Sequence, residues 1–227
     1  MKRTEVELGN IPLLILGESD RAFLFIHGLC GNKEEALRFA KVAEKHGWAV
    51  VSMGLPEHDG RTDGAKLVPW DVIPELERVM GFMRERYDQI SIRATSIGAY
   101  FSLMAFRGER IEKCLFASPL LDMVDMIGGL MKMNGVTEEK LREKGEIEVP
   151  GQTLSYRYLT FARENRPEPL CDTRILYGSR DELIPRRIID SFVEKGSCEL
   201  KVIDSEHWIH TPGAVAEMSA WEEQNTK

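Results

Sequence analysis

The feature that most constrains the fold of this chain is its alternation of short apolar runs with longer helical patterns. Eight runs have the length and composition of strands, at residues 5–8, 13–16, 22–28, 48–53, 89–95, 114–121, 174–178 and 199–204. Gly9, Asn10 and Pro12 separate the first two runs, which favours a hairpin at a sheet edge. The later runs alternate with helical patterns such as 32–46 and 71–87. This alternation predicts an α/β fold with a mainly parallel sheet of about eight strands and helices on both faces.

The length and composition favour one globular domain that spans residues 1–227. Of the 227 residues, 43% are hydrophobic and 30% are charged, which suits a single substantial core. The net charge of −7 argues against a nucleic-acid partner, because phosphate contacts need clustered Lys and Arg. Glu5 and Glu7 precede only a short apolar run, so neither a signal peptide nor a membrane partner is indicated. We expect a cytoplasmic protein.

The cysteines predict no disulfide framework and no metal site. They lie far apart, at positions 30, 114, 171 and 198, and none forms a C-x-x-C pair. The segment HDGRTDG, which begins at His58, has a spacing that fits no calcium or zinc template. We therefore interpret it as a solvated loop and expect the protein to need no cofactor.

One interval, residues 122–170, breaks the alternation of strands and helices. It separates the sixth and seventh strand runs and is far longer than an ordinary connection. It contains a Met-rich apolar stretch, a charged segment (TEEKLREKGEIEVPG) and a second apolar piece (SYRYLTFARENRP). We interpret the interval as a small helical lid; the alternative is a pair of surface helices without a lid function.

Residues capable of chemistry follow several of the predicted strands. Ligands of open parallel sheets bind outside the carboxyl ends of the strands, so the residues at these ends are the candidates. They include His27 at the end of the third run, Ser96 after the fifth, Asp122 after the sixth, Asp181 after the seventh and His207 after the eighth. A serine, an acid and a histidine thus follow one another in chain order along one edge of the predicted sheet.

The segment RATSIGAYFSLMAF places Ser96 at a strand-to-helix corner between two small residues, Ala94 and Gly98. Such a serine is either an ordinary helix N-cap or a nucleophile. Together with FIHG upstream and YGSRDELIP and SEHWIH downstream, the segment resembles the α/β-hydrolase fold superfamily, whose nucleophile elbow is G-x-S-x-G. Ala94 departs from that pattern by one methyl group. The similarity extends over essentially the whole chain, with residues 122–170 at the family's usual lid position.

The resemblance implies a catalytic triad and an oxyanion hole. Ser96 corresponds to the nucleophile, His207 to the general base and Asp181 to the acid that orients the base. The backbone N–H groups of Leu29 and Ile97 correspond to the donors that stabilise the developing oxyanion. The resemblance therefore predicts acyl transfer to serine and then to water.

Several neighbouring residues are alternatives to these assignments. His210 competes with His207 as the base, and Glu182 and Asp122 compete with Asp181 as the acid. His27 is interpreted as a brace of the oxyanion loop rather than as the base. Cys30 has no basic neighbour in sequence, so packing is a better interpretation for it than nucleophilic chemistry.

The expected activity is that of a carboxylesterase acting on small carboxylic esters. The candidate residues of the substrate pocket are His27, His58, Met126, Tyr156 and Trp208. The same triad serves thioesterases, amidases or peptidases and carbon–carbon bond hydrolases, so these remain alternatives. A non-catalytic ligand-binding protein is the alternative from another functional class. The sequence leaves the oligomeric state open, a homodimer included.

Overall fold

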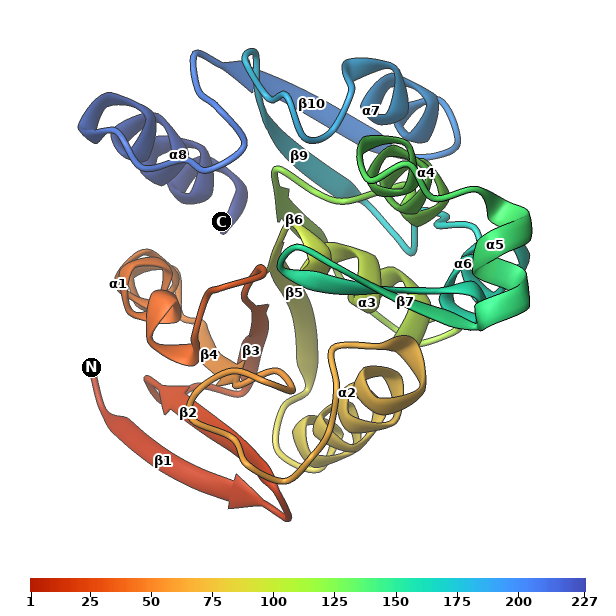
Figure 1. The fold of residues 1–227 in the computed structure, drawn as a ribbon. Coiled ribbons are helices and arrows are strands. Elements are labelled where there is room, and N and C mark those ends of the chain that lie inside the picture. The colour runs from red at the N-terminus through yellow and green to blue at the C-terminus, as the bar shows by residue number, and fades with distance from the viewer.

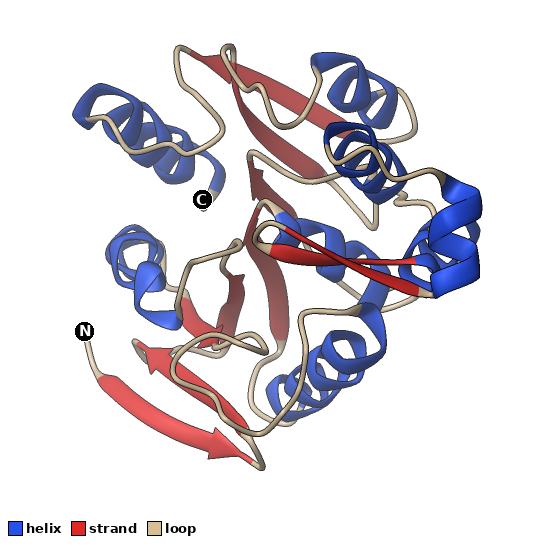
Figure 2. Cartoon of the chain, viewed as in Figure 1, coloured by secondary structure: helices blue, strands red, loops and turns tan.

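A computed structural model describes all 227 residues, and its centre is one eight-stranded sheet (Figures 1 and 2). In spatial order the strands are β1 (Arg3–Leu8), β2 (Ile11–Leu16), β4 (Ala49–Met53), β3 (Arg21–Ile26), β5 (Gln89–Thr95), β6 (Cys114–Ala117), β9 (Thr173–Gly178) and β10 (Cys198–Ile203). β2 pairs antiparallel with both β1 and β4, whereas all the other neighbouring strands are parallel. The predicted α/β fold with a mainly parallel sheet is confirmed.

Helices cover both faces of the sheet, as Figure 1 shows. One face carries α1 (Ala36–Lys45), which follows a 3₁₀ turn at Lys33–Glu35, and α8 (Pro212–Asn225). The other face carries α2 (Pro69–Arg84), α3 (Ile97–Ala105) and α7 (Arg186–Val193). No helix combines the length and the apolar character that crossing a bilayer would require.

The inner strand β3 has a continuous apolar run because its successive side chains enter two different cores. In β3, Phe23 and Phe25 pack in the core under α1 and α8, whereas Leu24 and Ile26 pack in the larger core under α2 and α3. Side chains alternate between the two faces of a strand, so a strand covered on both faces can be apolar at successive positions.

The predicted run at 114–121 is longer than the strand that forms. β6 ends at Ala117, because Ser118 turns into the left-handed region with φ 44° and Pro119 has no N–H for the ladder. The N–H of Ser96 donates to the carbonyl of Ala117 at 3.1 Å. The early end of β6 thus helps to hold the corner that follows β5.

Residues 122–170 form an insertion of three helices and one hairpin. The helices are α4 (Met123–Met133), α5 (Glu138–Lys144) and α6 (Tyr156–Glu164), and β7 (Glu146–Val149) pairs antiparallel with β8 (Gln152–Ser155). The hairpin was not predicted; its sequence, EIEVPGQTLS, mixes apolar with charged and polar residues because only one face of it is covered. The insertion packs on the larger core through Ile127, Leu141, Leu154 and Leu159.

A buried ion pair fixes α8 against β5, three residues before Ser96. The guanidinium of Arg93 on β5 donates to Glu222 of α8 at 3.0 Å and to the carbonyl of Ala94 at 2.9 Å. Both charged side chains are essentially inaccessible to solvent. Removing one partner of such a pair leaves an uncompensated buried charge, so this contact ties together the strand that carries Ser96 and the helix that follows His207.

Candidate active site

Ser96 lies at a strained corner between β5 and α3. Its backbone has φ 50° and ψ −119°, a conformation that costs on the order of 1–3 kcal/mol for a residue other than glycine. Its side chain makes no capping hydrogen bond to the amides of α3. The ordinary N-cap interpretation of Ser96 is therefore excluded by the geometry, and the hydroxyl is free for another partner.

Backbone strain in this molecule is concentrated at one edge of the sheet. Five residues other than glycine have positive φ, and all of them follow the carboxyl ends of neighbouring strands: Cys30 after β3, Glu57 and Asp59 after β4, Ser96 after β5 and Ser118 after β6. Strained backbone persists only where the surrounding structure enforces it, and it is enriched at functional sites. The strained residues and the candidate site residues thus both follow the carboxyl ends of the strands.

Gly98 allows α3 to start directly against the end of β3. A Cβ at this position would lie 2.5 Å from the carbonyl oxygen of His27 and 2.7 Å from that of Ile26, and these are backbone atoms that cannot rotate away. We expect Gly98→Ala to lower the free energy of unfolding by about 2 kcal/mol, as over-packing does elsewhere. Chemical denaturation measures this change.

Gly128, on an exposed part of α4, is the matched control for that substitution. A Cβ there meets nothing within 4 Å, so Gly128→Ala should raise stability by about 0.5–1 kcal/mol through helix propensity alone. Equal effects of the two substitutions would contradict the close contact inferred at Gly98.

Ser96, His207 and Asp181 form a continuous chain of hydrogen bonds. The Ser96 Oγ lies 2.9 Å from His207 Nε2, and His207 Nδ1 lies 2.7 Å from Asp181 Oδ2. Because a carboxylate accepts hydrogen bonds, Nδ1 carries the proton and Nε2 presents its lone pair to the serine hydroxyl. Three segments from distant parts of the chain thus meet at one point.

Asp181 is held so that one of its carboxylate oxygens faces His207. The other oxygen, Oδ1, accepts from the backbone N–H groups of Leu183 at 2.9 Å and Ile184 at 2.8 Å, and the side chain is fully buried. Gly178, at the end of β9, keeps the His207 loop close, since a Cβ there would lie 2.6 Å from the carbonyl of Glu206. The acid and the imidazole are therefore placed by backbone contacts on both sides.

The competing residues lie elsewhere. His210 is exposed, and its Nδ1 donates to the carbonyl of Trp208. Glu182 is exposed to solvent, and Asp122 caps α4 through Val124 and Asp125 while pairing with Arg166. None of the three forms a hydrogen bond or ion pair with Ser96 or His207.

Two backbone N–H groups next to Ser96 are available as hydrogen-bond donors. The N–H of Ile97 is the first of α3, where no preceding turn supplies a carbonyl. The N–H of Leu29 makes no hydrogen bond within the chain. Leu29 follows Gly28, where a Cβ would lie only 3.4 Å from the Cβ of Ser96. The two predicted oxyanion donors thus lie in two separate segments, the start of α3 and the loop after β3.

The comparisons with known proteins concern the fold. No model of a known protein family matches the chain, and no curated protein matches it in sequence. Solved structures match over nearly its whole length. The mouse alpha/beta hydrolase domain-containing protein 10 has a TM-score of 0.76 at 14% identity, covering 99% of this chain and 98% of its own. The chain has the α/β-hydrolase fold.

Two further structures with this fold differ in their described chemistry. Est1E from Butyrivibrio proteoclasticus, solved with ferulic acid bound, has a TM-score of 0.73 at 17% identity, covering 97% of this chain and 96% of its own. A thioesterase domain from the curacin biosynthetic pathway has a TM-score of 0.62 at 16% identity, covering 98% of this chain and 99% of its own. At such identities the likeness shows the fold alone, so the activity has to be argued from the site.

Within this α/β-hydrolase fold, His27 is buried beneath the loop that carries Leu29. Its Nδ1 donates to the carbonyl of Gly28 at 2.8 Å, and its Nε2 accepts from the N–H of Leu55 at 3.2 Å. The ring is fully buried, so it braces the loop and does not form an open wall of a pocket. Burial lowers the pKa of His27 to about 4.

This low pKa predicts that the fold loses stability in acid. Between pH 6.5 and pH 4, His27 is protonated in the unfolded chain but stays neutral in the native protein. The stability that the neutral ring contributes is therefore complete above pH 6.5 and is lost as the pH falls towards 4. We expect a loss of about 3 kcal/mol in unfolding free energy from this ring. Urea unfolding at pH 7 and pH 4 should show that His27→Gln loses less unfolding free energy in acid than the wild type. Equal losses in the two proteins would show that His27 is not the source of the acid sensitivity.

The other predicted pocket residues occupy different surroundings. Trp208 directly follows His207, is 73% exposed and stacks on His210 with ring centroids 4.3 Å apart. Met126 on α4 and Tyr156 on α6 are half-buried against the larger core, and neither makes a side-chain hydrogen bond to the triad. His58 contacts the backbone of Cys30 instead.

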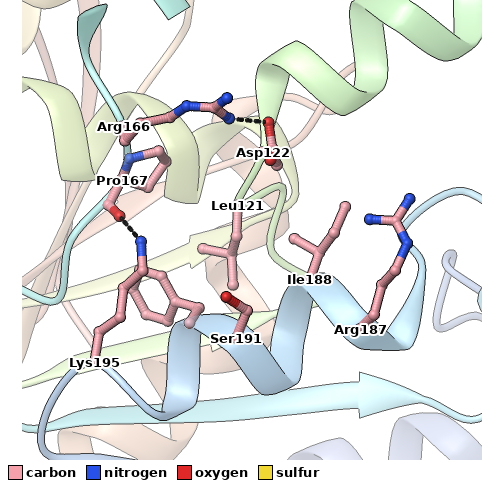
Figure 3. A pocket seen from close by; sticks show the side chains of 9 residues that line it. Leu121, Asp122, Arg166, Pro167, Arg187, Ile188, Ser191 and Lys195 are labelled. Atoms are coloured by element: carbon pink, nitrogen blue, oxygen red, sulfur yellow. Dashed lines mark hydrogen bonds and ion pairs between the residues drawn. The ribbon is translucent and has the colours of Figure 1, made fainter. Parts of the chain in front are cut away.

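A cavity of about 440 Å³ lies apart from the triad, between α7, the start of α4 and the segment before β9 (Figure 3). Its lining residues are Leu121, Asp122, Arg166, Pro167, Arg187, Ile188, Ser191, Phe192 and Lys195. Each of its three basic side chains already forms an ion pair with a carboxylate. No group of three His, Cys, Asp or Glu side chains in the molecule could hold a metal ion.

Sequence reasoning missed the contacts that support the site residues. Asp59 accepts from the N–H of Lys33 at 3.1 Å, and the N–H groups of Leu183 and Ile184 hold Asp181. The signal that could have indicated Asp59 is its place after β4, at the same sheet edge as Ser96. Backbone donors such as Ile184 leave no signal, because every residue except proline carries an N–H group.

Proposed function

We propose that the protein is a serine hydrolase that cleaves small carboxylic esters through an acyl-enzyme intermediate. The observation that carries this proposal is the unbroken chain of hydrogen bonds from Ser96 through His207 to Asp181, at 2.9 and 2.7 Å. A nucleophile, a base and an orienting carboxylate within hydrogen-bond distance of one another are the arrangement that activates a serine.

In the first half-reaction, Ser96 Oγ attacks the ester carbonyl carbon while His207 Nε2 takes the hydroxyl proton. The carbonyl π electrons move to its oxygen, and the resulting oxyanion accepts hydrogen bonds from the N–H groups of Leu29 and Ile97. Collapse of the intermediate breaks the bond to the alcohol oxygen, which receives the proton from His207. A water molecule then repeats the sequence on the acyl-enzyme and releases the acid.

Apolar side chains around the triad support an uncharged, apolar substrate. Leu29, Leu183 and Trp208, together named the apolar rim, are 65%, 49% and 73% exposed. Each lies in the same loop as one of the groups assigned above: Leu29 is an oxyanion donor, Leu183 donates to Asp181 and Trp208 follows His207. Large apolar side chains exposed beside a polar site are typical of a ligand-binding surface. We assign the 122–170 insertion the role of a lid that completes this surface.

The test uses the whole protein, a fluorophosphonate probe and a small panel of substrates. We expect stoichiometric labelling at Ser96 and hydrolysis of p-nitrophenyl acetate and butyrate. A matched thioester and a matched anilide distinguish esterase from thioesterase and amidase activity. A protein that is neither labelled nor active on any member of the panel would be a ligand-binding protein with this fold, contrary to the proposal.

A further inference from the structure

Two loops meet beside Ser96 and are joined by side-chain-to-backbone hydrogen bonds. The oxyanion loop (residues 27–33) follows β3, and the clamp loop (residues 54–61) follows β4. Two contacts join their ends: the N–H of Leu55 donates to His27, and Asp59 accepts from the N–H of Lys33. A third hydrogen bond, made by His58 of the clamp loop, also joins the two loops.

His58 holds the peptide that follows Leu29. The N–H of Cys30 donates to His58 Nε2 at 3.0 Å, while His58 Nδ1 donates to the carbonyl of Pro56 at 2.8 Å. The two partners fix the imidazole in one tautomer, with the acceptor nitrogen directed at the oxyanion loop. Cys30 has φ 62°, so the chain needs a specific contact to keep the strained turn in which Leu29 sits.

We infer that His58 is a positioning residue for the oxyanion hole. Its hydrogen bond fixes the Leu29–Cys30 peptide, while His27 Nδ1 holds the carbonyl of the preceding Gly28–Leu29 peptide, which carries the N–H of Leu29. With the peptides on both sides of Leu29 held, its backbone cannot rotate, and its N–H stays directed at the reacting carbonyl. Two observations point beyond an ordinary loop contact. The bond is made at the residue directly after the assigned donor, and strained backbone occurs on both sides of it, at Cys30 and at Glu57 and Asp59. The inference rests on the proposed ester hydrolysis.

The role predicts an effect on the transition state rather than on substrate binding. A single oxyanion-hole donor is worth about 10²–10³ in kcat, so misdirecting one without removing it should cost less. We expect His58→Ala to lower kcat for p-nitrophenyl butyrate about 10- to 100-fold with KM changed less than about threefold. His58→Gln should recover most of the loss, because its amide oxygen can accept from the N–H of Cys30 at the same reach.

His46→Ala serves as the matched control. His46 follows α1 at the opposite edge of the sheet and pairs with Glu223, so its loss should leave kcat unchanged. Hydrogen exchange of residues 27–33, followed by mass spectrometry, gives a second measurement: it should rise in His58→Ala and return towards the wild-type level in His58→Gln. Thermal unfolding of each variant shows whether the fold is retained.

The outcomes separate this inference from the proposed function. An active wild type whose His58→Ala variant keeps its kcat, or changes only in KM, overturns the positioning role and leaves the esterase proposal standing. A kcat of His58→Gln as low as that of His58→Ala would likewise overturn the positioning role and leave the esterase proposal standing. A wild-type protein that neither hydrolyses esters nor reacts with the fluorophosphonate overturns both.

Discussion

Replacing Ser96 with alanine is expected to lower kcat for p-nitrophenyl butyrate by at least about 10⁴-fold and to abolish fluorophosphonate labelling. The substitution removes the hydroxyl that His207 Nε2 contacts at 2.9 Å, and no other hydroxyl occupies that position. Stability should change little, because the alanine side chain keeps the same strained backbone and only one partly exposed hydrogen bond is lost. Initial rates, intact-protein mass spectrometry and thermal unfolding measure the three quantities.

Ser118 provides a matched control for this substitution. It also follows a parallel strand and has positive φ, with φ 44°, but its hydroxyl is buried without a hydrogen-bond partner. Ser118→Ala should therefore keep both the activity and the labelling. Equal hydrolysis by wild type and Ser96→Ala would remove Ser96 from the nucleophile's role, and loss of activity in both variants would indicate a general disturbance of this edge of the sheet.

Asp181→Asn is expected to lower kcat about 10⁴-fold while leaving the fold intact. The asparagine oxygen can still accept from the N–H groups of Leu183 and Ile184, so its NH₂ group faces His207 Nδ1. Two donors cannot face each other, so His207 must move its proton to Nε2. The imidazole then has no lone pair for the Ser96 hydroxyl. His207 therefore loses its function as a base although its side chain is still present.

Glu182, the adjacent and exposed carboxylate, is the matched control for Asp181. Glu182→Gln changes the net charge by the same amount, but Glu182 forms no hydrogen bond with Ser96 or His207, so the variant should retain wild-type kcat. Steady-state kinetics on both variants decide the matter. If Asp181→Asn kept kcat within about tenfold of the wild type, the carboxylate would not orient His207.

The strand pattern could be predicted from the sequence because it depends on local burial. The run 22–28 is almost continuous in apolar character because β3 is covered on both faces. Strand ends depend instead on backbone geometry, which is why β6 stops at Ala117 within the apolar run 114–121. The β7–β8 hairpin was missed because its strands have only four residues each and one face of it remains in solvent, so no continuous apolar run marks it.

By itself the sequence determined the eight-stranded α/β architecture and the chain order of Ser96, Asp181 and His207, since periodicity and residue order are properties of the chain. Only the tertiary structure decided which side chains meet: His207 rather than His210, and Asp181 rather than Glu182 or Asp122. It alone revealed His58 against the oxyanion loop. Hydrogen bonds form over about 3 Å between segments that are far apart along the chain, and no local pattern records such a distance.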